Sequence, residues 1–172
     1  MNLPAELQPT ASIDVTLPSG TVRQLPVCHP VFIGWPGKGL FDFGRKPILL
    51  YQGETYFAEL VILRMLQKRG WAGVWVNSFG RCYLDSMPKD WASRERVSIP
   101  DDKEKILKDI QRTGRTSASF DVFVWDGSQV LFCEAKHRHE DKFTAGQLRF
   151  IDAALNRGIP PERLLVVEWT SA

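Results

Sequence analysis

The sequence lacks the features of a disulfide-stabilised or zinc-binding protein. It contains only three cysteines, Cys28, Cys82 and Cys133, which are far apart and odd in number. This argues against a disulfide framework, and no Cys-x-x-Cys pair is present to suggest zinc. We therefore expect free thiols and a reducing, cytoplasmic location.

Long apolar runs and an excess of charge of one sign are also missing. No run approaches the roughly 18 residues of a membrane span, and the first ten residues lack the basic and apolar stretches of a secretory signal. The chain has 22 Lys and Arg against 20 Asp and Glu, a net charge of +2. This excludes a basic coat over the whole surface, so nucleic acid is expected to bind only through a local patch. We expect no membrane partner, and the sequence leaves homo-oligomerisation open.

What is present is the composition of one globular domain with an appendage. The chain has 172 residues, of which 44% are hydrophobic and 24% are charged, enough to bury a core without crosslinks. Residues 1–52 are rich in Pro and Gly, and the apolar stretches around Pro18-Ser19-Gly20 predict a hairpin. We interpret residues 1–52 as a β-rich N-terminal appendage and residues 53–172 as the core, with a partly helical insert at about 79–119.

The pattern of apolar residues in the core predicts an α/β fold. The expected elements are, in order, helix 54–69, strand 74–76, helix 101–112, strands 120–125 and 129–136 joined at Asp126-Gly127, helix 145–157 and strand 164–167. Helix 101–112 has a narrow apolar stripe and is expected on the surface. This order favours a mixed β-sheet flanked by helices.

Glu59 stands out on the first predicted helix. Ile62, Leu63 and Leu66 follow it by three, four and seven residues and therefore share its face. A carboxylate on a core-facing stripe is unfavourable unless it is paired or binds a metal. The alternative is a carboxylate at the edge of the stripe, which reaches water or pairs with an arginine.

The predicted hairpin brings two more carboxylates close together. Glu134 and Lys136 point to one face of strand 129–136, and the tight turn places Asp121 near Cys133, within one residue. Neighbouring carboxylates repel unless a cation lies between them, and oxygen-only ligands suit Mg²⁺ or Mn²⁺ better than zinc. The alternative is a solvated strand edge with an ordinary Glu134–Lys136 ion pair.

This set of residues resembles the PD-(D/E)XK nuclease superfamily. Members of that family carry an acid on the first helix, an Asp that opens one strand of a hairpin, and Glu-x-Lys on the next strand, often with a Gln on the helix that follows. The matching residues are Glu59, Asp121, Glu134, Lys136 and Gln147. The resemblance implies a restriction-endonuclease-like fold.

The resemblance covers roughly residues 53–169 and leaves out both the N-terminal appendage and the insert. Phe120 takes the place of the Pro in the family name. The tripeptide alone is weak evidence, because Asp101-Asp102-Lys103 and Glu140-Asp141-Lys142 also fit it. Only Glu134-Ala135-Lys136 lies on an apolar strand after a hairpin that begins with Asp.

The resemblance implies metal-dependent hydrolysis of phosphodiester bonds, with DNA favoured as the substrate. Asp121, Glu134 and the Ala135 carbonyl would hold Mg²⁺, or Mn²⁺ in its place, and Glu59 would ligate directly or through water. Lys136 would position the attacking water or stabilise the developing charge. The alternative is a non-catalytic module of the same fold that binds nucleic acid or a protein.

Polar residues after the hairpin have two interpretations each. Gln147 either belongs to the site or only completes the capping box that Thr144 begins. Arg138, Lys142 and Arg149 either contact phosphates beside the site or are solvated charges at an edge of the molecule.

Overall fold

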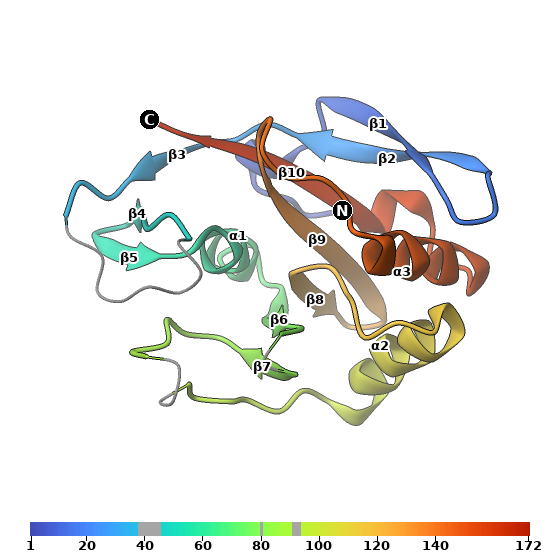
Figure 1. Ribbon diagram of the computed structural model, residues 1–172. Helices are drawn as coiled ribbons and strands as arrows, with labels where there is room; N and C mark the ends of the chain where they lie inside the picture. Colours follow the sequence, from blue (N-terminus) through green and yellow to red (C-terminus); the bar gives the residue numbers. More distant parts are fainter. Residues whose placement is uncertain (38–45, 80, 91–93) are drawn as a thin grey trace.

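A mixed β-sheet forms the centre of the molecule (Figure 1). The computed structural model describes residues 1–37, 46–79, 81–90 and 94–172. The strands in these residues are β1 (Ala11–Thr16), β2 (Val22–Cys28), β3 (Val31–Gly34), β4 (Leu49–Tyr51), β5 (Glu54–Tyr56), β6 (Ala72–Asn77), β7 (Cys82–Leu84), β8 (Val122–Asp126), β9 (Gln129–His137) and β10 (Leu164–Ser171). The helices are α1 (Ala58–Gln67), α2 (Asp101–Gly114) and α3 (Ala145–Asn156), with short 3-10 turns at Ala5–Leu7 and Pro161–Arg163.

The strand directions make the sheet mixed. The order is β5-β4-β3-β10-β9-β8-β6-β7, and β2, which carries β1 at its side, also joins β10. β10 runs parallel to β2, β3 and β9, whereas the remaining neighbours are antiparallel. The prediction of an α/β fold with a mixed sheet flanked by helices is confirmed.

Helices cover both faces of this sheet. α1 packs its apolar side chains against one face, together with Cys133 of β9. α2 and α3 pack on the opposite face, against Phe123 and Phe132 among others. Because side chains alternate along a strand, Phe132 and Glu134 point toward the α3 layer and Cys133 points toward α1. All three cysteines are buried free thiols.

The first predicted helix was wrong at its N-terminal end. Residues Glu54–Tyr56 form strand β5, and α1 begins only at Ala58. Gln52 and Gly53 have φ values of 56° and 84°, so the chain reverses there and pairs β4 with β5. The β-branched and aromatic side chains at 55 and 56 suit this strand better than the first turn of a helix.

The predicted hairpin of the core is confirmed as β8 and β9. Asp126 pairs with Gln129 and Val122 pairs with Cys133. Gly127 takes a φ of 56° in the turn, a conformation that glycine adopts without strain. Continued by one residue, this register places Asp121 beside Glu134.

The N-terminal strands extend the sheet of the core. The hairpin predicted around Pro18-Ser19-Gly20 is confirmed as β1 and β2, and β2 and β3 both pair with β10. In the predicted insert, β7 pairs with β6, and α2 buries Leu107 and Ile110 against the α3 layer rather than lying loosely on the surface. The division of the chain at residue 52 stays a prediction. Within the described residues, no helix is long and apolar enough to cross a membrane.

Candidate active site

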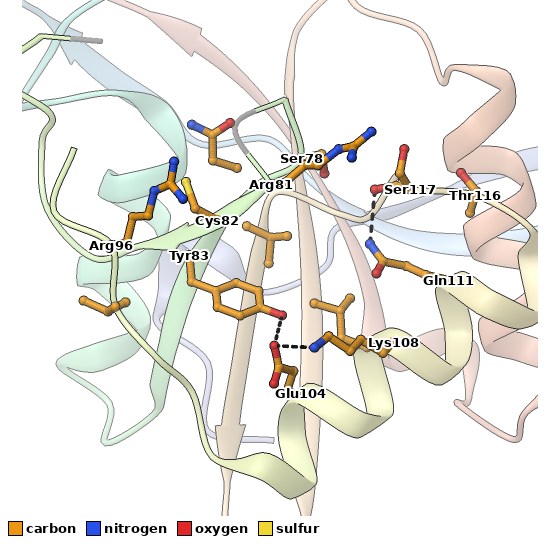
Figure 2. A pocket seen from close by; sticks show the side chains of 14 residues that line it. Ser78, Arg81, Cys82, Tyr83, Arg96, Glu104, Lys108, Gln111, Thr116 and Ser117 are labelled. Carbon is orange, nitrogen blue, oxygen red and sulfur yellow. Dashed lines mark hydrogen bonds and ion pairs between the residues drawn. The ribbon is translucent and has the colours of Figure 1, made fainter. Parts of the chain in front are cut away.

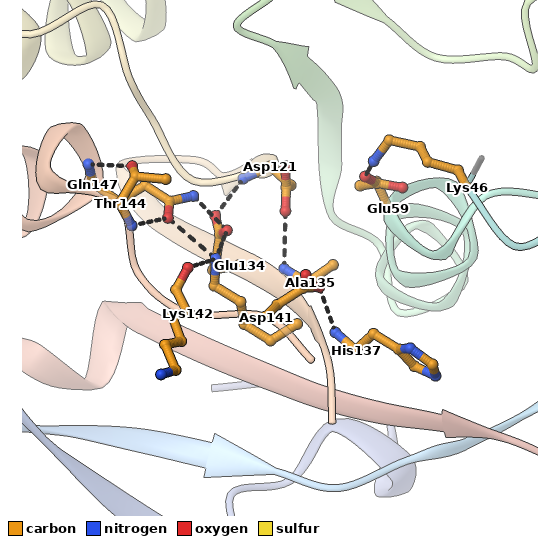
Figure 3. Close-up of polar contacts among 11 residues, drawn as sticks. Lys46, Glu59, Asp121, Glu134, Ala135, His137, Asp141, Lys142, Thr144 and Gln147 are labelled. Carbon is orange, nitrogen blue, oxygen red and sulfur yellow. Dashed lines mark hydrogen bonds and ion pairs between the residues drawn. The ribbon is translucent and has the colours of Figure 1, made fainter. Parts of the chain in front are cut away.

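The open end of the β8–β9 hairpin brings Asp121 and Glu134 together (Figure 3). The backbone N–H of Asp121 donates to Glu134 Oε2 at 3.2 Å, and the backbone N–H of Ala135 donates to Asp121 Oδ2 at 3.0 Å. Glu134 is only 2% exposed. The backbone of each strand therefore holds the carboxylate of the other strand in place.

Lys136 joins this pair from the same strand. Its Nζ lies 2.9 Å from Glu134 Oε1 and donates to the backbone carbonyl of Lys142 at 3.0 Å and to Gln147 Oε1 at 3.1 Å. The side chain is 8% exposed. These three contacts fix the position of the ammonium group and hold it against the Glu134 carboxylate.

Gln147 completes the predicted capping box and also contacts the carboxylate cluster. Its side-chain amide donates to Glu134 Oε1, while its Oε1 accepts from Lys136. The same residue completes a capping box, because its backbone N–H donates to Thr144 Oγ1 at 3.2 Å and its Oε1 accepts from the Thr144 N–H at 3.1 Å. The cap at the start of α3 thus orients a side chain that bridges Glu134 and Lys136.

The environment favours the protonated forms of both carboxyl groups. Burial raises the pKa of Asp121 well above its usual range, and the charges of Glu134 and Glu59 raise it further. Burial also raises the pKa of Glu134, although Lys136 and Gln147 oppose that rise. A cation placed between these carboxylates would favour their ionised forms.

Glu59 lies apart from this cluster. It is 4% exposed on α1, on the side of Asp121 away from Glu134, and it forms an ion pair with Lys46 (Figure 3). Its charge is close enough to raise the pKa of Asp121. Hydrogen bonds therefore join Asp121, Glu134, Lys136 and Gln147. Glu59 interacts with this group through the electrostatic effect of its charge on Asp121.

Lys46 is a charged residue of the site that the sequence did not point to. Burial lowers the pKa of Lys46, but the carboxylates of Glu59, Asp121 and Glu134 more than compensate and raise it overall. Its Nζ also lies 5.7 Å from the centre of the Trp75 ring. Lys46 follows the first gap in the described residues and precedes β4, in a segment with no motif, so no local pattern could have identified it.

A pocket of about 490 Å³ opens beside the carboxylates, and we call it the active-site pocket. Lys46, Asp121 and Gln147 line it, together with Ser119 and Phe79. The Ser119 hydroxyl is buried and has no hydrogen-bond partner within the described ranges. The carboxylate cluster is therefore next to a space that a ligand could fill, with a polar atom that is still unpaired.

The donor atoms of the site are of the kind that a hard divalent cation prefers, and Mg²⁺ needs only one or two carboxylates because it keeps several water ligands. Asp121, Glu134 and the Ala135 carbonyl supply oxygen, the ligand atom that Mg²⁺ and Mn²⁺ prefer. In the part of the chain that the structure describes, no three His, Cys, Asp or Glu side chains lie close enough together to hold an ion. Asp121 and Glu134 could begin a metal site, and Glu59 would have to release Lys46 or act through water.

Arg138, Lys142 and Arg149 are all exposed. Figure 3 shows the Lys142 side chain pointing away from the Asp121–Glu134 pair, while its backbone carbonyl accepts from Lys136. Contact of these three residues with phosphates stays a prediction.

Replacing Lys46 with methionine should lower the stability of the protein. The change leaves the buried Glu59 carboxylate without its ion-pair partner. Because the Lys46 side chain is 38% exposed, water reduces the effect, and we expect a loss of about 1–2 kcal/mol. Thermal unfolding should show this as a fall in Tm of roughly 2–8 °C.

The double variant Lys46→Met/Glu59→Gln provides the matched control. It removes the stranded charge and should recover part of the lost stability. Equal Tm values for Lys46→Met and the unmodified protein would show that the ion pair contributes nothing.

Comparison of the chain with family models, with curated proteins and with solved structures gave no match.

Proposed function

We propose that the protein is a metal-dependent nuclease of the PD-(D/E)XK type that hydrolyses phosphodiester bonds, with DNA as the favoured substrate. One observation carries this proposal. Asp121 directly before β8, Glu134 and Lys136 on β9 and Gln147 on α3 form one hydrogen-bonded cluster beside a pocket. Glu134 and Lys136 are buried in it. An ordinary solvated strand edge would leave these side chains exposed and separate.

The element order supports a restriction-endonuclease-like core. α1 is followed by the antiparallel strands β6, β8 and β9, then by α3 and by β10, which runs parallel to β9. This is the helix, three strands, helix and strand order of that fold. The strands β1 to β5 and the segment that holds β7 and α2 are then additions of this chain.

In this proposal Asp121, Glu134 and the Ala135 carbonyl would hold Mg²⁺ or Mn²⁺, with Glu59 as a ligand through water. When bound there, such an ion would supply positive charge to the phosphate and lower the pKa of the attacking water. Gln147 and the Asp121 N–H orient Glu134 by donating to it. Lys136 places its ammonium where it can hold the attacking water or stabilise negative charge in the transition state.

A binding module of the same fold is the second candidate. Two ion pairs, Lys46 with Glu59 and Lys136 with Glu134, partly neutralise the carboxylates without any metal. In such a module the lysines would be permanent structural partners, and the site would bind without cleaving.

Incubation of the pure protein with nucleic acids separates the two candidates. We expect cleavage of at least one of plasmid, linear duplex, branched DNA and RNA in Mg²⁺ or Mn²⁺, and none in EDTA. Metal-dependent nicking or shortening should be visible on a gel. Binding of these substrates without cleavage in either metal would favour the binding module.

A further inference from the structure

A second pocket, of about 660 Å³, lies next to the active-site pocket (Figure 2). The two pockets share Val76, Asn77 and Ser78, at the end of β6 and the start of the turn that leads to β7. A ligand that leaves the active-site pocket over this turn therefore enters the second pocket. Its size falls in the range of about 300–1,000 Å³ that is typical of small-molecule sites.

The second pocket has an excess of positive charge. Its charged lining residues are Arg81, Arg96, Lys108 and Glu104. Glu104 is already paired with Lys108 at 2.9 Å and accepts from the Tyr83 hydroxyl at 3.2 Å. Both arginine side chains remain available for an anion, because within residues 1–37, 46–79, 81–90 and 94–172 neither has an ion-pair or hydrogen-bond partner.

The arginines reach the pocket from different segments. Figure 2 shows Arg81 extending toward the side where Thr116 and Ser117 lie, and Arg96 lying on the other side of the pocket. A guanidinium group presents paired N–H donors to a phosphate, and two such groups on opposite sides of one pocket can each bind a different phosphate of one strand. The pattern therefore favours a polyanion that crosses the pocket.

Phe79 lies at the turn between the two pockets. It lines the active-site pocket and is 87% exposed, which is unusual for a large apolar side chain. Exposed aromatic rings beside cationic side chains are a common platform for unpaired bases. A base in an intact duplex stays in its stack, and moving it onto such a ring is unfavourable.

We infer that the substrate carries a single-stranded segment next to the cleaved bond. This strand crosses Asn77 and Ser78 at the end of β6, stacks one base on Phe79 and places its next phosphates against Arg81 and Arg96. The inference rests on the proposed nuclease function and adds the class of substrate: nucleic acid with an unpaired arm rather than continuous duplex.

Equilibrium binding in EDTA tests this inference without any need for cleavage. Fluorescence anisotropy compares a blunt duplex with the same duplex carrying a single-stranded arm. The unmodified protein should bind the arm-bearing duplex at least tenfold more tightly. Arg81→Ala/Arg96→Ala should weaken that binding by about 10–100-fold, and Phe79→Ala by about tenfold.

The salt dependence identifies the lost contacts. Each phosphate contact to a single strand contributes about 0.7 to the slope of log K against log salt, so the double arginine variant should lower the slope by roughly 1.4. Arg23→Ala is the matched control, because Arg23 is exposed on the distant β1–β2 hairpin and carries the same charge. It should leave affinity and slope nearly unchanged.

The outcomes separate this inference from the proposed function. Equal binding of both duplexes, or unchanged binding by the arginine and Phe79 variants, overturns the inference even if the protein cleaves DNA. A loss as large in Arg23→Ala overturns it as well, because the effect would then reflect net charge. If the protein binds the single-stranded arm selectively but shows no metal-dependent cleavage, the inferred binding surface is supported and the proposed nuclease function is contradicted.

Discussion

Replacing Lys136 with methionine should reduce Mg²⁺-dependent cleavage by about 10²–10³-fold, the usual effect of removing one positioned group that stabilises charge. Methionine keeps much of the length and volume of lysine but has no cation. The Glu134 carboxylate would still accept from Gln147 and from the Asp121 N–H. The cluster should therefore stay assembled, so that the lost activity reports the missing ammonium.

The control for this variant is Lys105→Met, at an exposed position on α2. It should cleave at the rate of the unmodified protein. Near-UV circular dichroism and thermal unfolding establish that Lys136→Met is folded. A folded Lys136→Met protein with full activity would show that the active site lies elsewhere.

The fold could be predicted where apolar periodicity decides the structure. Helix 145–157, the hairpin around Asp126-Gly127 and the last strand all lie close to their observed positions, because each has a clear period and a clear turn or stop signal. The helix predicted for residues Glu54–Tyr56 was wrong, since these residues continue into an apolar helix without a break in pattern. Their strand depends on pairing with β4, which is a tertiary contact.

The site could be predicted only in its local parts. Asp121, Glu134 and Lys136 sit on one hairpin, so turn length and alternation were enough to place them side by side. The apolar stripe of the helix correctly predicts that Glu59 is buried. The only ion-pair partner that the sequence suggested for it was an arginine. The partner is Lys46, from a segment before β4, which no period or motif connects with α1.

Asp121→Asn should greatly reduce the rate of cleavage and at the same time stabilise the metal-free protein at neutral pH. Asparagine removes a formal charge from the proposed metal site, so the rate should fall by about 10²–10³-fold. Its side-chain oxygen can still accept the Ala135 N–H that now bonds Asp121 Oδ2 at 3.0 Å. The fold should therefore be kept, while the carboxylate that is repelled by Glu134 and Glu59 is removed.

The sign of the stability effect follows from the pKa of Asp121. Burial and the charges of Glu134 and Glu59 raise this pKa in the folded protein above its value of about 3.9 in the unfolded chain. The folded state therefore binds more protons than the unfolded state between the two pKa values, and stability falls as pH rises through that window. Above the folded pKa, the ionised Asp121 carboxylate lowers the free energy of unfolding by its full amount. Asp121→Asn has no carboxylate and avoids this loss of stability.

Thermal unfolding in EDTA from about pH 4 to pH 8 measures this effect. The difference in Tm between Asp121→Asn and the unmodified protein should be smallest at the acidic end, where the carboxyl group is protonated in the folded state and about half protonated in the unfolded chain. It should become positive with rising pH, by roughly 2–4 °C for each 1 kcal/mol. Asp14→Asn, at an exposed position on β1, should show no such trend.

Added Mg²⁺ should reverse the order of stability. An ion that binds the native state raises Tm by mass action, and this gain requires the Asp121 charge. Saturating Mg²⁺ should therefore raise the Tm of the unmodified protein by several degrees and that of Asp121→Asn by much less. If Mg²⁺ stabilises both proteins equally, or if Asp121→Asn cleaves DNA at the normal rate, Asp121 does not hold the metal. If both proteins lose stability alike between pH 4 and pH 8, ionisation of Asp121 does not destabilise the folded protein.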